Sequence, residues 1–251
     1  MSDSTLLEST EIPAPKRSWI WFALTSGLVL IFLVSLFLGR YPQAGLVRLE
    51  QLQENELARL LVFNVRLPRL LTALLLGMVM ASAGTVFQMI FANPLVEPGF
   101  LGVSQGAAFG AALGIVFLGA TSMAVQGLAI IFAFIGLGFS YLLARRMHIG
   151  DWLLRLVLAG IAVSALFSAG VGIIKFMADP MRQLPEITFW MLGGLASITW
   201  TKFLSILPAC LVGLAIMLIF RWRLNLLALE ETTAFSLGAA PRRERLLLMT
   251  A

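Results

Sequence analysis

The sequence predicts an all-α protein, a polytopic bundle of transmembrane helices with about six complete spans and the start of a seventh. Three observations lead to this prediction. Hydrophobic residues make up 59% of the 251 residues and charged residues 12%, whereas soluble domains carry roughly 45–50% and ~25%. Long apolar runs recur along the chain. All six tryptophans lie near the ends of apolar segments, where aromatic side chains meet the lipid headgroups.

Each of six apolar runs is long enough to cross about 30 Å of hydrocarbon as a helix. They are Trp19–Leu38, Leu70–Phe91, Phe100–Leu118, Met123–Leu143, Leu153–Met177 and Leu204–Phe220. The first is longer than the ~7–15 apolar residues of a signal peptide, and no cleavage site of small residues follows it, so we expect a retained span. A further segment, Ile187–Trp200, is too short to cross, and we expect it to lie at a surface or to enter the membrane and return.

The expected organisation is a polar cytoplasmic tail over residues 1–18 and a transmembrane domain over residues 19–251. With the N-terminus inside, ten Lys and Arg residues are cytoplasmic and eight are external, which favours this orientation. Five of the eight lie in the first external loop, together with Glu50, Glu54 and Glu56. That loop is either an ordinary solvated loop or a docking surface for an acidic partner. Because the basic residues flank apolar runs, the net charge of +5 indicates membrane anchoring, and we expect no nucleic-acid partner.

Small residues recur at four-residue spacing in three runs, so each set forms a stripe on one helix face. The stripes are Ala73, Gly77, Ala81 and Thr85 in the second run, Gly102, Gly106, Gly110 and Gly114 in the third, and Gly160, Ser164, Ser168 and Gly172 in the fifth. For the second and third runs we expect close helix packing. For the fifth, two interpretations stand equally: close packing, or a smooth and mildly polar wall of a passage.

The residue inventory points away from an enzyme. No Asp or Glu lies within the six runs, so an intramembrane proton or ion relay is not expected. Walker loops, HExxH motifs and nucleophile–base pairs are absent, Cys210 and His148 are single, and we expect no cofactor and no metal. Gln88, deep in the second run, is expected to form a hydrogen bond between helices. Any uphill transport must therefore draw its energy from a partner.

Several motifs occur in a defined order along the chain. They are Arg66-Leu67-Pro68-Arg69, Asn93-Pro94-Leu95-Val96-Glu97-Pro98, Leu101-Gly102-Val103-Ser104-Gln105-Gly106-Ala107, Leu158-Ala159-Gly160-Ile161-Ala162, Phe189-Trp190-Met191-Leu192-Gly193-Gly194, and Leu226-Leu227-Ala228-Leu229-Glu230-Glu231 followed by Ala234 and Leu237-Gly238. Together, from about Arg59 to Gly238, they resemble the FecCD/BtuC-like permease subunits of binding-protein-dependent ABC importers for iron chelates, haem and cobalamin.

The resemblance implies a multi-pass subunit of the bacterial cytoplasmic (inner) membrane. It would form the pathway for an iron chelate of the siderophore type, with haem, cobalamin or an oxyanion as alternatives. The implied partners are a separate ABC ATPase, which hydrolyses the ATP, a periplasmic or lipoprotein substrate-binding protein, and a second permease copy or paralogue. The subunit itself would have no catalytic site.

The resemblance also implies site residues, each with a simpler structural alternative. Arg66 and Arg69 would receive acidic residues of the binding protein; Pro68 predicts that the helix of the second span begins between them. Asn93 and Leu95 would form part of the cytoplasmic gate, and the alternative is a plain rigid turn. The passage wall would be the stripe of the fifth run. Within the polar segment of residues 223–245, the residues Glu231, Ala234, Leu237 and Gly238 would contact the ATPase.

Two departures from the family pattern stand out. The loop before the fifth run carries Gly150-Asp151-Trp152 where some relatives have small hydroxyl residues, so we assign no gate residue there. Family members have about ten spans, and a span needs ~20 residues, whereas this sequence stops at Ala251. We therefore expect a truncated or split permease, and the competing hypothesis is a non-transporting membrane scaffold or remnant.

Overall fold

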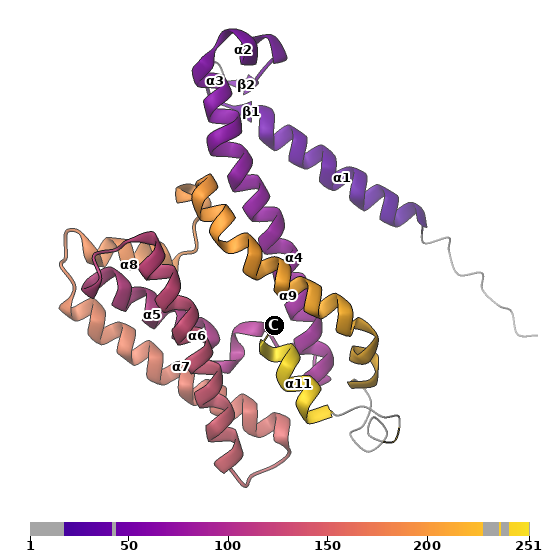
Figure 1. Cartoon of the computed structure of the whole chain (residues 1–251), viewed down its shortest axis with the longest axis vertical. Helices are drawn as coiled ribbons and strands as arrows, with labels where there is room; N and C mark the ends of the chain where they lie inside the picture. Colours follow the sequence, from indigo (N-terminus) through magenta and orange to yellow (C-terminus); the bar gives the residue numbers. More distant parts are fainter. Residues whose placement is uncertain (1–17, 42–43, 228–235, 237–240, 251) are drawn as a thin grey trace, which may run out of the picture. The chain divides into compact units, whose positions relative to one another are not determined.

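The computed structural model describes residues 18–41, 44–227, 236 and 241–250, and the prediction of an all-α fold is confirmed within them (Figure 1). Five helices have the length and composition of membrane spans, and a sixth, α5, is a shorter apolar helix. The chain divides into two compact units, Met1–Leu70 and Leu71–Ala251. Each unit has its own packing.

The first unit joins a long apolar helix to a small polar cap. Its elements are α1 (Ser18–Phe37), β1 (Leu38–Gly39), β2 (Gly45–Leu46), α2 (Leu49–Glu54), α3 (Glu56–Leu60) and the π-helical η1 (Leu61–Arg66). β1 and β2 pair antiparallel, with Leu38 opposite Leu46. Asn55 separates α2 from α3 because its side-chain oxygen accepts a hydrogen bond from the backbone N–H of Ala58 at 3.1 Å. Leu36, Val47, Leu52 and Val62 are the buried core of this unit.

The second span differs from expectation at its start. The chain is already helical at Glu56, and α4 (Leu67–Phe91) continues from η1 without a break. Pro68 is therefore an interior proline rather than the beginning of a helix. A proline has no N–H to donate to the preceding turn, and in membrane helices local π adjustments are one way in which the freed backbone groups are satisfied again. The π-helical segment η1 lies directly before it.

The second unit contains the remaining helices. They are the C-terminal part of α4, the 3₁₀ turn η2 (Pro98–Leu101), α5 (Val103–Phe117), α6 (Ser122–Arg146), α7 (Trp152–Met177), α8 (Gln183–Met191), the 3₁₀ turn η3 (Leu195–Ser197), α9 (Trp200–Leu227) and α11 (Pro241–Thr250). Four of the six expected runs match α5, α6, α7 and α9. The apolar segment before α9 forms α8 and η3, so it does not cross as one helix.

Helices α5, α6 and α7 pack against one another within this unit (Figure 1). The stripe on α5 faces α6 at very short range: a Cβ on Gly106 would lie 2.4 Å from the carbonyl oxygen of Phe132, and one on Gly110 would lie 2.2 Å from that of Leu128. Close packing is confirmed for this stripe. The stripe on α4 behaves differently, because Ala73, Gly77, Ala81 and Thr85 are all exposed and no described atom approaches Gly77 within 4 Å.

One end of the second unit, here called the basic end, holds the C-termini of α4, α6 and α9 and the N-terminus of α7. Its described arginines are Arg145, Arg146, Arg155, Arg221, Arg223 and Arg245. A buried apolar cluster contributed by α4, α6, α7, α9 and α11 lies beneath them. Ser140, fully buried on α6, donates a hydrogen bond to the carbonyl oxygen of Leu101 at 2.8 Å and so holds η2 against α6.

Candidate functional site

The turn that follows α4 is rigid and projects one apolar side chain. The Asn93 side-chain oxygen accepts a hydrogen bond from the Leu95 N–H at 2.9 Å, and Gln88 donates to the Pro94 carbonyl at 3.1 Å. The expected helix–helix bond of Gln88 is therefore wrong: the amide braces the turn that begins five residues later. Val96 is buried in the apolar cluster, whereas the side chain of Leu95 is 85% exposed. The turn thus presents Leu95 from a fixed backbone.

The turn between α6 and α7 lies at the same end and is braced in another way. Arg155 donates to the carbonyl oxygens of Met147 at 2.9 Å and Asp151 at 3.2 Å. The Asp151 carboxylate caps α7 by accepting from the N–H of Leu154 at 3.1 Å. Ile149 remains 65% exposed at the tip. The sequence assigned no gate residue in this turn, and the exposure of Ile149 there is a property that only the structure gives.

Aromatic side chains join the two helices that flank this second turn. Tyr141 on α6 and Trp152 on α7 meet edge to face with their ring centroids 5.4 Å apart. The guanidinium group of Arg145 lies 5.9 Å from the Tyr141 ring centroid, and that of Arg155 lies 5.9 Å from the Trp152 ring centroid. At this distance a cation is attracted to the face of an aromatic ring. The two turns are therefore both fixed at the basic end, one by amide hydrogen bonds and the other by an arginine.

The stripe on α7 divides into two parts. Gly160 is buried, and a Cβ there would lie 2.5 Å from the carbonyl oxygen of Phe100 and 3.0 Å from the Cα of Leu101. Ser164 is half-buried, whereas Ser168 and Gly172 are exposed, with no described atom within 4 Å of a Cβ at Gly172. Glycine at 160 is thus explained by its contact with η2. The C-terminal half of the stripe is a small, weakly polar surface on the unit's exterior.

Arg66 and Arg69 lie in the first unit, and their surroundings differ. Arg66 is half-buried and donates from Nη1 to the Leu36 carbonyl oxygen at 3.3 Å, in the last turn of α1. That carbonyl has no donor within its own helix, so the guanidinium satisfies it and complements the helix dipole. The guanidinium lies on Gly39, where a Cβ would be only 1.8 Å from Nη2. Arg69 is also half-buried, one turn further along. Arg66 therefore already holds α1 beside η1.

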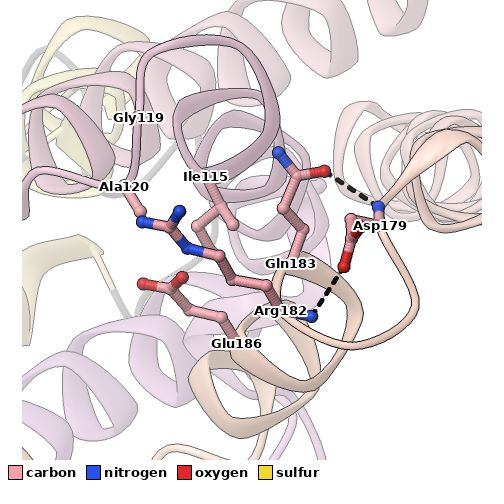
Figure 2. Close-up of a pocket in the computed structure, with 7 residues that line it drawn as sticks. All are labelled: Ile115, Gly119, Ala120, Asp179, Arg182, Gln183 and Glu186. Atoms are coloured by element: carbon pink, nitrogen blue, oxygen red, sulfur yellow. Dashed lines mark hydrogen bonds between the residues drawn. The ribbon is translucent and has the colours of Figure 1, made fainter.

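A small hollow of about 250 Å³ lies at the end of the second unit opposite the basic end (Figure 2). It is lined by Ile115, Gly119, Ala120, Asp179, Arg182, Gln183 and Glu186. Asp179 and Gln183 form its rim, because the Asp179 carboxylate accepts from the N–H of Arg182 at 2.9 Å and the Gln183 amide bridges the Asp179 N–H at 2.9 Å and the Val116 carbonyl at 3.2 Å. The rim ties α8 to the end of α5.

The polar segment after α9 is described only at its two ends and at Ser236. Glu231, Ala234, Leu237 and Gly238, the predicted ATPase contacts, lie outside the described residues. On either side of them, α9 and α11 are joined: Arg223 pairs with Glu244, and Arg245 donates to the Leu227 carbonyl oxygen at 3.3 Å. Sequence reasoning missed this junction, because it needs the two helices to be brought side by side.

The predicted site residues thus fall into separate places. The structure brings Asn93 and Leu95 together in one turn at the basic end, and places Gly160, Ser164, Ser168 and Gly172 along α7. Arg66 and Arg69 belong to the other unit. Within the described part of the chain, no three His, Cys, Asp or Glu residues cluster as metal ligands.

Comparison with known proteins gives one consistent family. The molybdate import system permease protein MolB of Haemophilus influenzae is 39% identical over 233 residues, which cover 89% of this chain and 68% of that protein. The probable iron chelatin transport system permease protein of Helicobacter pylori is 37% identical, over 76% of this chain and 57% of that protein. The hemin transport system permease protein HmuU of Yersinia pestis is 36% identical, over 89% and 69%. This chain therefore spans little more than half to about two thirds of the length of these relatives.

Comparison with solved structures points to the same class of protein. A transporter assigned to the metal-chelate type of ABC transporters, in an inward-facing conformation, matches with a TM-score of 0.82 and 36% identity over 93% of this chain and 72% of that one. The model of the FecCD transport family matches residues 27–251. The described helices, the family match and the structural likeness thus cover almost the same stretch, and the chain is a member of the FecCD transport family.

Proposed function

We propose that this chain is the permease subunit of a binding-protein-dependent ABC importer. The observation that carries the proposal is the family match over residues 27–251, on a fold that follows a solved ABC transporter over 93% of the chain. The subunit carries out no bond chemistry. It would supply the membrane pathway, and an ATPase subunit would supply the energy through the segment of Glu231, Ala234, Leu237 and Gly238.

The gate in this proposal is the pair of turns at the basic end. Leu95 and Ile149 are exposed apolar tips on turns that are held by internal hydrogen bonds. Two such tips, together with those of a second permease copy, would close a narrow apolar constriction that dewets and blocks solutes. Because each turn is fixed to the ends of long helices, rocking of the helices would open the constriction without local unfolding.

The pathway in this proposal runs along the exposed half of α7, past Ser168 and Gly172. Ser168 has a short, uncharged side chain and Gly172 has none, so a bulky solute would pass this surface without binding tightly to it. The opposite wall would come from a second permease copy or paralogue. Gly160 contributes differently, since its close contact with η2 couples α7 to the turn that carries Leu95.

The proposed orientation places the basic end in the cytoplasm. Within the second unit the sequence carries eight Lys and Arg residues at or beyond that end, counting Arg242 and Arg243, against Lys175, Arg182 and Lys202 at the other. This ratio agrees with the positive-inside rule better than the whole-chain count of ten to eight. A reporter fused after Arg146 should be cytoplasmic and one fused within residues 51–55 should be external; reporters on the same side would contradict the orientation.

The proposed substrate is an iron chelate of the siderophore type. The Helicobacter pylori and Yersinia pestis relatives, named for iron chelatin and hemin, support a bulky iron complex. A second candidate is the oxyanion molybdate, favoured by the 39% identity to MolB.

The test reconstitutes the complete importer in liposomes with its ATPase and binding protein. We expect ATP-dependent uptake of ⁵⁵Fe-siderophore and not of ⁹⁹Mo-molybdate, and the reverse would select the second candidate. Association with the ATPase should weaken for Glu231→Lys while membrane insertion stays normal. A chain that inserts normally but neither retains an ATPase nor supports uptake of either substrate would favour the scaffold alternative.

A further inference from the structure

The two helices that flank the proposed ATPase segment are fastened together by three charged residues. Arg245, on α11, is only 8% exposed, and its Nη2 donates to the carbonyl oxygen of Leu227, the last residue of α9. Glu244, 7% exposed, pairs with Arg223 one turn before the end of α9. Two adjacent residues of α11, Glu244 and Arg245, therefore each contact the last turn of α9.

The position of these contacts is unusual for surface arginines. A helix leaves its last four carbonyl groups without donors of its own, and a cation at that end also complements the helix dipole. Arg245 supplies both in a site largely removed from solvent. Burying a guanidinium is unfavourable unless it is paired. The Leu227 carbonyl satisfies the Nη2 of Arg245, its Nε has no hydrogen-bond partner among the described residues, and the ion pair of this junction joins Glu244 to Arg223.

The apolar packing beneath these contacts also joins α9 to α11. Leu224 and Leu227 of α9 and Leu248 of α11 are buried in the cluster that also contains residues of α4, α6 and α7. Leu227 thus serves twice: its side chain enters the cluster and its carbonyl accepts from Arg245. The end of α9 and α11 thus share one apolar cluster with the residues beneath the turns of Leu95 and Ile149.

We propose that Arg245, with the Arg223–Glu244 pair, is a clamp that makes α9 and α11 move as one body when the ATPase acts on the segment between them. The coupling part of this inference rests on the proposed function; the clamp itself rests on the contacts. Arg245 is a positioning residue in this proposal, because it acts through Leu227 and touches no substrate. Without the clamp, a displacement of the segment would separate the two helix ends instead of rocking them together.

The experiment measures the clamp and its consequence separately. Spin labels on cysteines placed at Trp222 and Leu247, both exposed, report the α9–α11 distance in the full chain after Cys210→Ser. The variants are Arg245→Ala, Arg245→Lys, Arg223→Glu, and the charge swap Arg223→Glu with Glu244→Arg. Arg221→Glu is the matched control, because it makes the same charge change on an exposed residue of the same helix.

We expect one narrow distance distribution for the parent chain and for Arg221→Glu. Arg245→Ala and Arg223→Glu should broaden it, and Arg245→Lys and the charge swap should restore most of it. In the reconstituted importer, substrate transported per ATP hydrolysed should fall about tenfold for the two broadened variants, within the ~5–150-fold range of coupling between sites. It should recover in the charge swap, while ATPase association changes less.

Two results would overturn the clamp. One is a distribution that stays narrow in Arg245→Ala and Arg223→Glu. The other is a broadened distribution with an unchanged transport-to-hydrolysis ratio, which would leave a structural contact without a role in coupling. Failure of the proposed function gives a different signature: the parent chain would then retain no ATPase at all, and the distance measurement on the chain alone would still decide whether the contacts hold the helices together.

Discussion

Replacement of Gly110 by alanine tests the packing on which the second unit depends. A Cβ at this position would lie 2.2 Å from the carbonyl oxygen of Leu128, 2.7 Å from its carbonyl carbon and 2.9 Å from the Cβ of Phe132. Ordinary contact begins at 3.4 Å, so α5 and α6 would have to separate by about 1.2 Å. Since the obstructing atoms include backbone, no side-chain rotation removes the overlap.

The expected cost follows from two opposing effects. Overpacking of this kind destabilises by about 1–3 kcal/mol. The higher helix propensity of alanine offsets up to about 1 kcal/mol of that. The net loss is then about 0–3 kcal/mol, which would lower the melting temperature by up to roughly 12 °C for a chain of this size. A Cβ at Gly106 would lie 2.4 Å from a carbonyl oxygen, so Gly106→Ala should respond like Gly110→Ala. A Cβ at Gly114 would lie 3.0 Å from the Cα of Val125, so Gly114→Ala should respond less.

Gly127 is the matched control, because it lies on α6 with open space around its Cα. Alanine there should be neutral or stabilising by up to about 1 kcal/mol. The assay is unfolding of the detergent-solubilised chain, followed by circular dichroism and tryptophan fluorescence. A second control distinguishes backbone from side-chain obstruction. Gly170→Ala meets the ring of Phe109 at 2.6 Å, so Phe109→Leu should relieve it, whereas Leu128→Ala should not rescue Gly110→Ala.

The reasoning would be refuted if Gly110→Ala were as stable as Gly127→Ala. It would also be refuted if Leu128→Ala restored the stability of Gly110→Ala, because the obstruction would then be the side chain of Leu128. Either result would mean that α5 and α6 are not in backbone contact along this stripe.

Further substitutions test single positions. Ser140→Ala should destabilise the chain by about 0.6 kcal/mol, the average for hydrogen bonds between membrane helices, and by no more than about 1.7 kcal/mol, the largest value; an unchanged unfolding midpoint would show that the bond to η2 is not formed. Leu95→Ser should change stability by less than about 0.5 kcal/mol, because the side chain is 85% exposed, yet it should raise passive substrate leak in liposomes if the turn is a gate. Arg66→Glu with Arg69→Glu should slow binding-protein association and flatten its salt dependence, whereas a normal rate at low and moderate salt would contradict docking. Arg66→Lys separates the two roles, since it keeps the charge but loses the fork that grips α1.

The Arg66 contact changes how that docking experiment must be interpreted. Its guanidinium bonds a carbonyl in α1 and rests on Gly39, so charge reversal there disturbs the first unit as well as any docking surface. Arg69→Glu alone is the less disruptive probe of docking. A loss of association in Arg69→Glu with an unchanged unfolding midpoint would support docking directly.

The sequence by itself determined that the chain lies in lipid and where along it the helices occur. The length of each apolar run, the tryptophans at the run ends and the ordered motifs are local properties, so the six helical segments and the family were predictable from them. A helix in lipid must satisfy its own backbone hydrogen bonds, and for that reason apolar length alone predicts where helices occur. The rigid Asn93 turn was likewise predictable, because proline and asparagine act within a few residues.

What only the tertiary structure decided was which helix face meets which neighbour. Four-residue spacing marks a smooth stripe, but the same spacing is packed on α5, exposed on α4 and divided between both on α7. Three side-chain hydrogen bonds that hold separate elements together join residues far apart in the sequence: Arg66 with Leu36, Ser140 with Leu101, and Arg245 with Leu227. Each depends on the rotation and register of two helices, which their shared packing determines and which no local pattern encodes.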